Sequence, residues 1–306
     1  MAAKKKSTTV RPLPLVFQAL EKVAPAVGGK LLDRIWFRLP PVPEKARRLR
    51  VQLPEGTPFE VPFEHGAVRG TAWGEGPTIY LVHGWGGWGL QLAAFIPPLL
   101  ADGFRVVAYD GPSHGESGPG REGPGRSTMV ELADAFQAVV AAQGPAYGVV
   151  AHSIGAAAIS QALKSGLDPR RLVFVAAATD FQVTMDQYQA FLRFGPRIRE
   201  QFLRRFTRRF GTMESFEVGA VIERLAKVRE LPPLLAIHDR ADRETQYQGS
   251  ERLVSVWPDA SLELTDGLGH NRVLWSPEVV ESARKFLSAD RASGDGLRVG
   301  QERMQG

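Results

Sequence analysis

Ser153 is the first side chain whose surroundings suggest chemistry. It lies in the pentapeptide AHSIG (residues 151–155), after an apolar β-type run and before an Ala-rich helical run. Small residues two positions before and after the serine let the two backbones approach, as in the tight strand-to-helix turns that expose a nucleophile. The alternative is a serine that only caps the helix N-terminus. The strand before it and the helix after it favour the nucleophile.

A glycine-rich segment, HGWGG (residues 83–87), directly follows the apolar strand predicted at residues 79–82. Glycines at this place allow a turn in which backbone N–H groups face a reaction site and stabilise an oxyanion. The N–H groups of Trp85 and Ile154 are the candidate donors. A turn without special purpose is the alternative. A phosphate-binding loop is not indicated, because neither Gly-Lys-Ser/Thr nor GxGxxG follows.

A serine nucleophile needs a base, and His270 is the best candidate among the six histidines. It ends the segment LTDGLGH (residues 264–270), on a loop after the last predicted strand. His114, in DGPSHG (residues 110–115), is the competitor, because it also follows a predicted strand.

The base in turn needs a carboxylate to fix its tautomer. Asp239 and Asp242 both follow the strand predicted at residues 234–238, and Asp180 ends another predicted strand. Asp239 lies so close to the strand that we expect it to bond to nearby backbone N–H groups. Asp242 has the reach to approach His270 and is the preferred acid. No further ligand spacing accompanies this His/Asp cluster, so neither a metal nor a cofactor is expected.

Alternating β-type and helix-type patterns position these residues. Near-continuous apolar strands between helices predict an α/β fold, in which a mostly parallel sheet is covered on both faces and ligands bind beyond the carboxyl ends of the strands. Strands are predicted at residues 59–63, 68–73, 79–82, 105–109, 147–151, 172–177, 234–238 and 261–264, and helices at 90–102, 127–143, 154–164, 245–256 and after Pro277. A helix is also predicted from about Leu15 to Phe37, broken near Pro25 and Gly28.

The 306-residue chain has 43% hydrophobic and 23% charged residues, which is typical of a soluble globular protein. It has no cysteine, which excludes disulfides and cysteine nucleophiles. Residues 1–50 contain 12 Lys and Arg against 3 Asp and Glu, and residues 181–229 contain 10 against 5. The rest of the chain is acidic, so nucleic-acid binding is not expected as the main function. The basic N-terminus followed by a short apolar stretch is the alternative signature of a secretory signal, but Gln18 interrupts this stretch, which favours an amphipathic surface helix.

Taken together, these motifs resemble those of the α/β-hydrolase-fold serine hydrolases. Residues 83–87 are similar to the family's HGxxG loop, residues 110–117 to its DxxGHGxS loop, and residues 151–155 to its nucleophile elbow. Residues 238–242 are similar to its HGxxD acid loop, and Gly269-His270 to its terminal histidine. The departures are Ala151, Ser113 and Asp239, which stand where the family has Gly. The resemblance implies catalytic residues Ser153, Asp242 and His270.

The resemblance also implies a small helical cap, which fits the Arg-rich segment at residues 181–230. The expected organisation is a basic N-terminal extension and linker at residues 1–57, a core at 58–180 and 231–289, and a disordered tail at 291–306. Trp88, Phe181 and Tyr188 are candidates for lining a substrate pocket, although such aromatics often serve core packing.

The sequence therefore predicts a cytoplasmic serine hydrolase that cleaves a carboxylic ester or thioester through an acyl-enzyme. An acyltransferase, a C–C hydrolase, a lyase or a non-catalytic binding protein of the same fold is the alternative. The expected partner is a small-molecule substrate, with no stable nucleic-acid partner and no transmembrane segment. The basic N-terminus is compatible with a weak contact with an anionic surface, and the arginines of the cap with a preference for acidic substrates.

Overall fold

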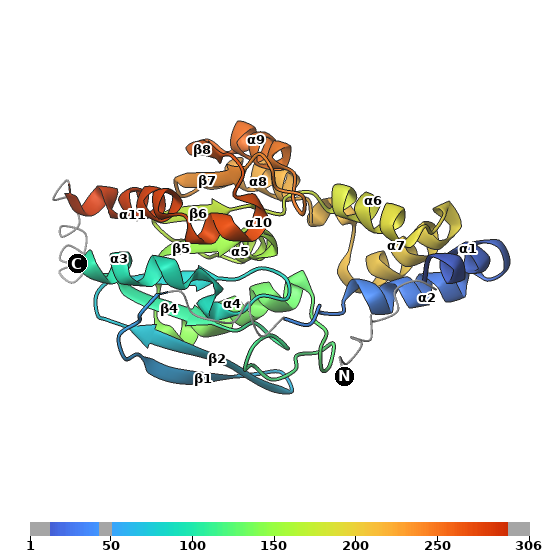
Figure 1. Cartoon of the computed structure of the whole chain (residues 1–306), viewed down its shortest axis with the longest axis horizontal. Coiled ribbons are helices and arrows are strands. Elements are labelled where there is room, and N and C mark those ends of the chain that lie inside the picture. The colour runs from blue at the N-terminus through green and yellow to red at the C-terminus, as the bar shows by residue number, and fades with distance from the viewer. Residues whose placement is uncertain (1–12, 43–50, 293–306) are drawn as a thin grey trace, which may run out of the picture. The chain divides into compact units, whose positions relative to one another are not determined.

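An eight-stranded sheet forms the centre of the computed structural model, which describes residues 13–42 and 51–292 (Figure 1). The strand order is β1-β2-β4-β3-β5-β6-β7-β8. β2 pairs antiparallel with β1 and β4, and all other pairs are parallel, which confirms the predicted fold class. The strands are β1 (Thr57–Phe63), β2 (Gly66–Trp73), β3 (Thr78–Val82), β4 (Arg105–Tyr109), β5 (Ala146–His152), β6 (Arg171–Val175), β7 (Leu234–Asp239) and β8 (Ala260–Thr265).

Helices cover both faces of this sheet. The helices α4 (Met129–Gln143), α5 (Ile154–Lys164), α8 (Val218–Ala226) and α9 (Tyr247–Val256) share a core with one face, and α3 (Ile96–Ala101) and α11 (Pro277–Ala292) with the other. Successive side chains of β5 point to opposite faces: Val149 and Ala151 belong to the first core and Val150 to the second. Because both faces are buried, the strand is apolar at every one of these positions. Two short elements, α10 (Gly269–Arg272) and a 3-10 helix at Val273–Trp275, connect β8 to α11.

Most predicted bounds lie within a few residues of the observed ones, and β4 and α5 agree fully. The helix predicted at residues 90–102 is instead a 3-10 helix, Gly89–Phe95, followed by α3. Leu92 has a non-helical backbone, and prolines occupy the start of α3, where a missing N–H costs nothing. At the other end of the chain, α11 extends to Ala292, two residues into the predicted disordered tail, and the rest of that tail lies outside the described residues.

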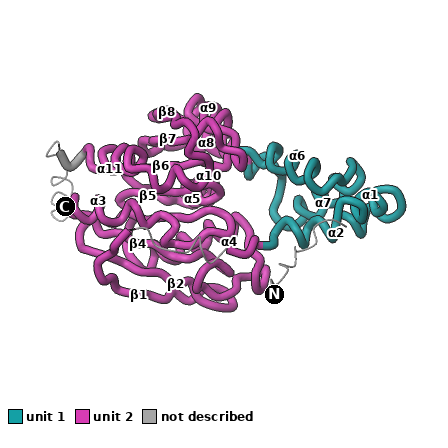
Figure 2. Tube along the Cα trace, in the orientation of Figure 1, with its two compact units in different colours: residues 1–38, 180–216 teal, residues 39–179, 217–306 magenta. Residues whose placement is uncertain are grey.

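Four helices form a second compact unit, which we call the helical unit. It comprises residues 1–38, of which 1–12 are not described, and Asp180–Phe216; the remainder is the core unit (Figure 2). Its elements are α1 (Leu13–Val23), α2 (Pro25–Trp36), α6 (Phe181–Leu192), α7 (Pro196–Phe210) and a 3-10 helix at Met213–Ser215. The predicted break near Pro25 is observed at Ala24, between α1 and α2, whereas the break predicted near Gly28 does not occur. Gly28 lies inside α2, where a Cβ would overlap the Ile198 side chain of α7.

The helical unit is closed by contacts between distant parts of the chain. The Glu21 carboxylate of α1 accepts hydrogen bonds from the backbone N–H groups of Gly195, Arg197 and Ile198 at 3.1, 2.8 and 3.0 Å. These are N–H groups at the start of α7 that have no partner within the helix, so Glu21 caps it and offsets its dipole. Aromatic rings fill the interior, with Trp36 packing on Phe202 at a centroid distance of 5.3 Å.

This organisation differs from the bounds expected from the sequence. Residues 13–38 are not a separate extension, because α1 and α2 pack with α6 and α7. The inserted part of the helical unit ends at Phe216, well before residue 230, because Val218 and Ile222 of α8 are buried in the core beneath the sheet.

Candidate active site

Ser153 lies at a strained turn between β5 and α5. Its φ and ψ are 54° and −123°, a region that non-glycine residues rarely adopt and that costs about 1–3 kcal/mol. It occupies the N-cap position of α5, but its side chain makes no capping hydrogen bond. Among the described residues the hydroxyl has no hydrogen-bond partner at all. The strain therefore presents a free hydroxyl rather than a capped helix.

Close approach of backbones explains the small residues around this turn. A Cβ at Gly155 would lie 2.8 Å from the carbonyl oxygen of His83 and 2.9 Å from that of Val82. A Cβ at Gly84 would lie 2.9 Å from Cβ of Ser153. All three distances are too short for real atoms, so glycine is required at both positions.

The pairing of β3 with β5 brings the two candidate oxyanion donors to neighbouring strand ends. Val82 pairs with Ala151, and Trp85 and Ile154 each lie three residues beyond this pair. In the part of the chain that the structure describes, neither N–H group donates to another protein group. The N–H of Ile154 is at the first position of α5, where the helix dipole adds a partial positive charge. The two N–H groups are thus available to an anionic oxygen.

His270 and Asp242 form a buried pair at the ends of β8 and β7. Nδ1 of His270 lies 2.7 Å from Oδ2 of Asp242, and the side chains are 7% and 0% exposed. Because the carboxylate can only accept, Nδ1 carries the proton and Nε2 of neutral imidazole is left as the acceptor. Burial opposes ionisation of Asp242, but hydrogen bonds from His238 and His270 hold the pKa of this carboxyl well below its usual range. Asp242 therefore stays charged beside the imidazole.

Two residues that sequence reasoning did not select complete the surroundings of Asp242. The Thr245 hydroxyl lies 3.0 Å from Oδ2 of Asp242 and 3.2 Å from Nδ1 of His270, and its N–H donates to Oδ1 at 3.0 Å. Nε2 of His238 lies 3.1 Å from the Thr245 carbonyl and 3.4 Å from Oδ2, so this nitrogen carries a proton. The spacing Asp-x-x-Thr, in which an Asp side chain accepts from the N–H three residues on, was the available signal for Thr245.

Asp239 is fully buried and holds the loop that carries His270. Its Oδ1 accepts from the N–H groups of Ala241 and Gly269 at 2.9 and 2.8 Å, and its Oδ2 from the N–H of Leu268 and the hydroxyl of Thr265 at 2.9 and 2.8 Å. Burial opposes ionisation, but these donors together keep the pKa of Asp239 below its usual value. The bond to Ala241 is the local one expected from the sequence, whereas the bonds to residues 268 and 269 span about 30 positions.

The remaining candidates for base and acid have other partners. His114 donates from Nδ1 to the Pro112 carbonyl at 2.9 Å and accepts at Nε2 from the Gly86 N–H at 3.1 Å. Burial lowers the pKa of His114 to about 3, so it is neutral. Asp180 belongs to the helical unit, where its carboxylate accepts from the Val183 N–H and caps α6.

His152 connects the serine turn to the histidine loop. Its Nε2 donates to the carbonyl oxygen of His270 at 3.0 Å, and the two rings lie 4.6 Å apart. Burial and the neighbouring His270 lower the pKa of His152 to about 3, so the ring is neutral. The structure thus brings Ser153 and His270 to neighbouring turns. A hydrogen bond between them is not formed, which is common in ligand-free sites, where such bonds tighten when substrate binds.

The three candidate pocket residues lie apart from this cluster or pack on other rings. Trp88 lines a hollow with residues of β1, β2 and β4, and the lining includes neither Ser153 nor His270. Phe181 and Tyr188 pack on Trp36 within the helical unit, at centroid distances of 5.0 and 4.7 Å. Their contact with a substrate remains a prediction.

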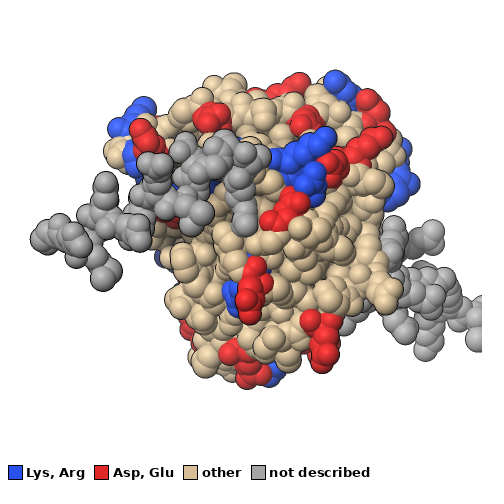
Figure 3. Space-filling view, turned by 90° about the vertical axis from the view of Figure 1, so that its left-hand side faces the viewer, with Lys and Arg blue, Asp and Glu red and all other residues tan. Residues whose placement is uncertain are grey.

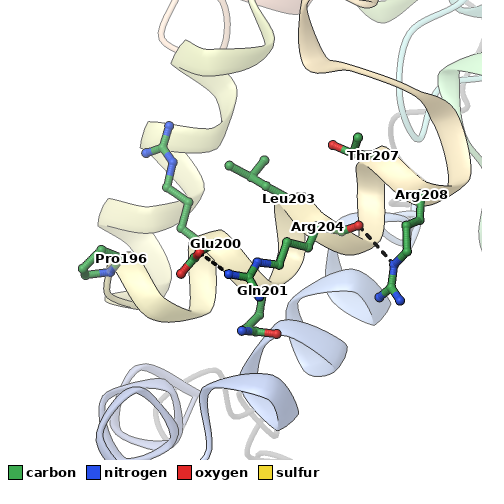
Figure 4. A pocket seen from close by; sticks show the side chains of 8 residues that line it. Pro196, Glu200, Gln201, Leu203, Arg204, Thr207 and Arg208 are labelled. Carbon is green, nitrogen blue, oxygen red and sulfur yellow. Dashed lines mark hydrogen bonds and ion pairs between the residues drawn. The ribbon is translucent and has the colours of Figure 1, made fainter.

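Three of the six arginines of α7 contact a carboxylate. Arg199 contacts Asp186, Arg204 contacts Glu200 at 2.6 Å, and Arg209 contacts the buried Asp33 at 3.5 Å. Figure 4 shows the surface hollow along this helix, in which Glu200 and Arg204 face each other. The hollow therefore carries less positive charge than the sequence suggests. In the described ranges 13–42 and 51–292, no three histidine or carboxylate side chains gather in a way that could hold a metal ion.

A sequence profile of the alpha/beta hydrolase family matches residues 79–283, which is most of the chain and contains every element of this cluster. The chain belongs to the alpha/beta hydrolase family. A serine hydrolase-like protein of Danio rerio is 31% identical to this chain over 99 residues. The match covers 32% of this chain and 30% of the relative, so the chain spans less than a third of that relative's length.

Solved structures show the same alpha/beta hydrolase fold. A bromoperoxidase from Bacillus anthracis has a TM-score of 0.58 and 17% identity over 76% of this chain and all of that one. A serine hydrolase involved in carbazole degradation has a TM-score of 0.55 and 18% identity over 77% of this chain and all of that one. Est1E from Butyrivibrio proteoclasticus, solved with ferulic acid, has a TM-score of 0.56 and 13% identity over 77% and 98% of the two chains. At such identities the likeness concerns the fold and leaves the reaction open.

Proposed function

We propose that this alpha/beta hydrolase is a serine hydrolase that cleaves a carboxylic ester or thioester. The observation that carries the proposal is the strained, unpartnered hydroxyl of Ser153 beside a buried His270–Asp242 pair. Strain of this kind persists where the surroundings enforce it, typically at reactive positions. A solely structural turn would not need a charged carboxylate buried behind a histidine.

In the proposed reaction, Oγ of Ser153 attacks the substrate carbonyl while Nε2 of His270 takes the hydroxyl proton. The N–H groups of Trp85 and Ile154 stabilise the oxyanion that forms. His270 then gives the proton to the leaving alcohol or thiol, and an acyl-Ser153 ester remains. Water then attacks this ester while His270 takes its proton; the bond between the acyl group and Oγ breaks, the acid leaves, and His270 returns the proton to Oγ of Ser153. Asp242 keeps Nδ1 protonated and stabilises the imidazolium throughout.

Labelling with a serine-directed fluorophosphonate tests the nucleophile. The wild type is expected to be labelled at Ser153, and Ser153→Ala should lose both labelling and turnover of nitrophenyl esters. Ser165→Ala is the matched control, because Ser165 lies at the opposite end of the same helix and is exposed. Undiminished labelling of the Ser153→Ala variant would refute the assignment, and an unlabelled wild type would favour a binding protein.

The acid has its own test. Asp242→Asn preserves the shape of the side chain but lets the amide favour the wrong tautomer of His270. We expect kcat to fall by about 10²- to 10⁴-fold with little change in KM. An active, folded Asp242→Asn variant would exclude Asp242 as the acid. Transfer of the acyl group to an added alcohol in preference to water would identify an acyltransferase with the same residues.

A further inference from the structure

The surface of α1 that faces away from the other helices of the helical unit is unusually apolar. Phe17 and Glu21 point inward, whereas Leu15, Ala19 and Val23, spaced four residues apart, lie exposed on the opposite side. Leu15 is 67% and Val23 80% exposed. Of the six large hydrophobic side chains that are most exposed among the described residues, only one belongs to the core unit. The other five, in the helical unit, are Leu15, Val16, Val23, Val27 and Phe191.

The charges around this surface are of one sign. Lys22 and Lys30 are exposed on α1 and α2. The two acids of these helices are turned inward: Glu21 caps α7, and Asp33 is buried and pairs with Arg209. By contrast, acidic and basic side chains are interspersed on the side of the molecule shown in Figure 3. Over its described residues the helical unit has 11 Lys and Arg against 6 Asp and Glu.

We propose that this surface, formed by Leu15, Val16, Ala19, Val23 and Val27 with Lys22 and Lys30, binds the surface of an anionic lipid membrane. Aliphatic side chains that project from a helix and are flanked by lysines suit the boundary between headgroups and acyl chains, where the lysine stems lie along apolar groups and the ammonium groups meet phosphates. No described helix is long and apolar enough to cross a membrane, so the contact is peripheral.

Two other occupants fit less well. A symmetric dimer through this surface would bring Lys22 and Lys30 of two copies together, where like charges repel. The centre of a protein–protein interface is usually enriched in tryptophan, tyrosine and arginine and depleted of lysine. Apart from Gln18, the exposed side chains of α1 are leucine, valine, alanine and lysine, with no tryptophan, tyrosine or arginine among them. The proposal does not depend on the hydrolase reaction.

The chain supplies a matched pair of variants. Lys22-Val23 ends α1, and Lys227-Val228 follows α8 in the core unit; Val23 and Val228 are 80% and 79% exposed. Full-length protein is sedimented with vesicles of phosphatidylcholine containing about one third phosphatidylglycerol. Wild type and Lys227→Gln/Val228→Ser should bind alike. Lys22→Gln/Val23→Ser should bind about 30-fold more weakly. The loss of one lysine should lower the affinity about fivefold, the loss of the valine by a similar factor, and the two factors multiply.

Further measurements separate the outcomes. Binding should weaken between about 0.1 and 0.5 M salt, because the lysines act through screened charge. Ser153→Ala should bind vesicles as the wild type does, so failure of the proposed reaction leaves this test intact. Equal binding by the two double variants, no binding to anionic vesicles, or equal binding to pure phosphatidylcholine would overturn the proposal. A dimer in light scattering that only Lys22→Gln/Val23→Ser dissociates would assign the surface to a second copy instead.

Discussion

Replacing Asp239 with Asn should show whether the buried carboxylate positions His270. Asp239 accepts four hydrogen bonds, and an amide has only one oxygen to replace two. If the amide oxygen keeps the bonds to Ala241 and Gly269, its NH2 group faces Leu268 and Thr265. The Thr265 hydroxyl can rotate and accept, but the Leu268 N–H is left facing another donor.

The expected loss of stability follows from the hydrogen bonds that the amide cannot replace. One buried N–H without an acceptor costs about 1–3 kcal/mol, and the loss of charge weakens the remaining bonds by about 1 kcal/mol. We therefore expect the free energy of unfolding to fall by about 2–4 kcal/mol. Because the affected N–H groups directly precede His270, the imidazole should also shift. A displacement of about 1 Å can cost about 100-fold in rate, so we expect kcat to fall by about 10- to 100-fold.

Urea denaturation and ester hydrolysis would measure the two effects. Thr265→Val is the graded control, because it removes one bond without adding a donor, and should cost about 1 kcal/mol. The contribution of Asp239 to the free energy of unfolding should also depend on pH, in a direction that can be predicted. Since the pKa of Asp239 is lower in the folded protein than its usual value of about 3.9, its stabilisation is present above that value and is lost as the pH falls. The stability gap between wild type and Asp239→Asn should therefore narrow below about pH 4. An Asn variant with wild-type stability and kcat would refute this reasoning.

Two further predictions concern the serine turn. Ser153→Gly should be about 1 kcal/mol more stable than Ser153→Ala in urea denaturation, because glycine relieves the positive φ of 54° that alanine retains; equal stabilities would mean that the turn is not strained. Gly155→Ala should lose about 1–3 kcal/mol and most fluorophosphonate labelling, because the new Cβ would press on the carbonyl oxygens of His83 and Val82; wild-type labelling and thermal stability would contradict this close contact.

Sequence reasoning succeeded where local patterns decide the structure. The strand at Arg105–Tyr109 and the helix at Ile154–Lys164 match their predicted bounds, because an apolar run and an Ala-rich run leave little ambiguity. The sheet direction and the order of the motifs also followed from the sequence, and the structure places Asp242 within 2.7 Å of His270. The catalytic roles of these residues stay predictions.

The rest depends on contacts between distant residues. Nothing near Glu21 in the sequence reveals that its carboxylate caps a helix beginning at Pro196, so α1 and α2 were predicted as an extension. Asp239 was expected to serve only its own turn, because its bonds to Leu268 and Gly269 require the pairing of β7 with β8. Thr245 was overlooked because its hydroxyl gains importance only when His270 lies beside it.

The cap that Glu21 forms on α7 also has a consequence for the order of folding. The partners lie 174 to 177 residues apart, so during synthesis α1 and α2 leave the ribosome long before α7 exists. Until then, α1 and α2 can contact each other but lack α7, so the side chains of Phe17 and Leu32, which are buried in the complete fold, are not fully covered. Most of the central strands are made in this interval, so they can pair first. The helical unit is then completed late, and a nascent chain stalled before residue 195 would expose these apolar side chains to chaperones.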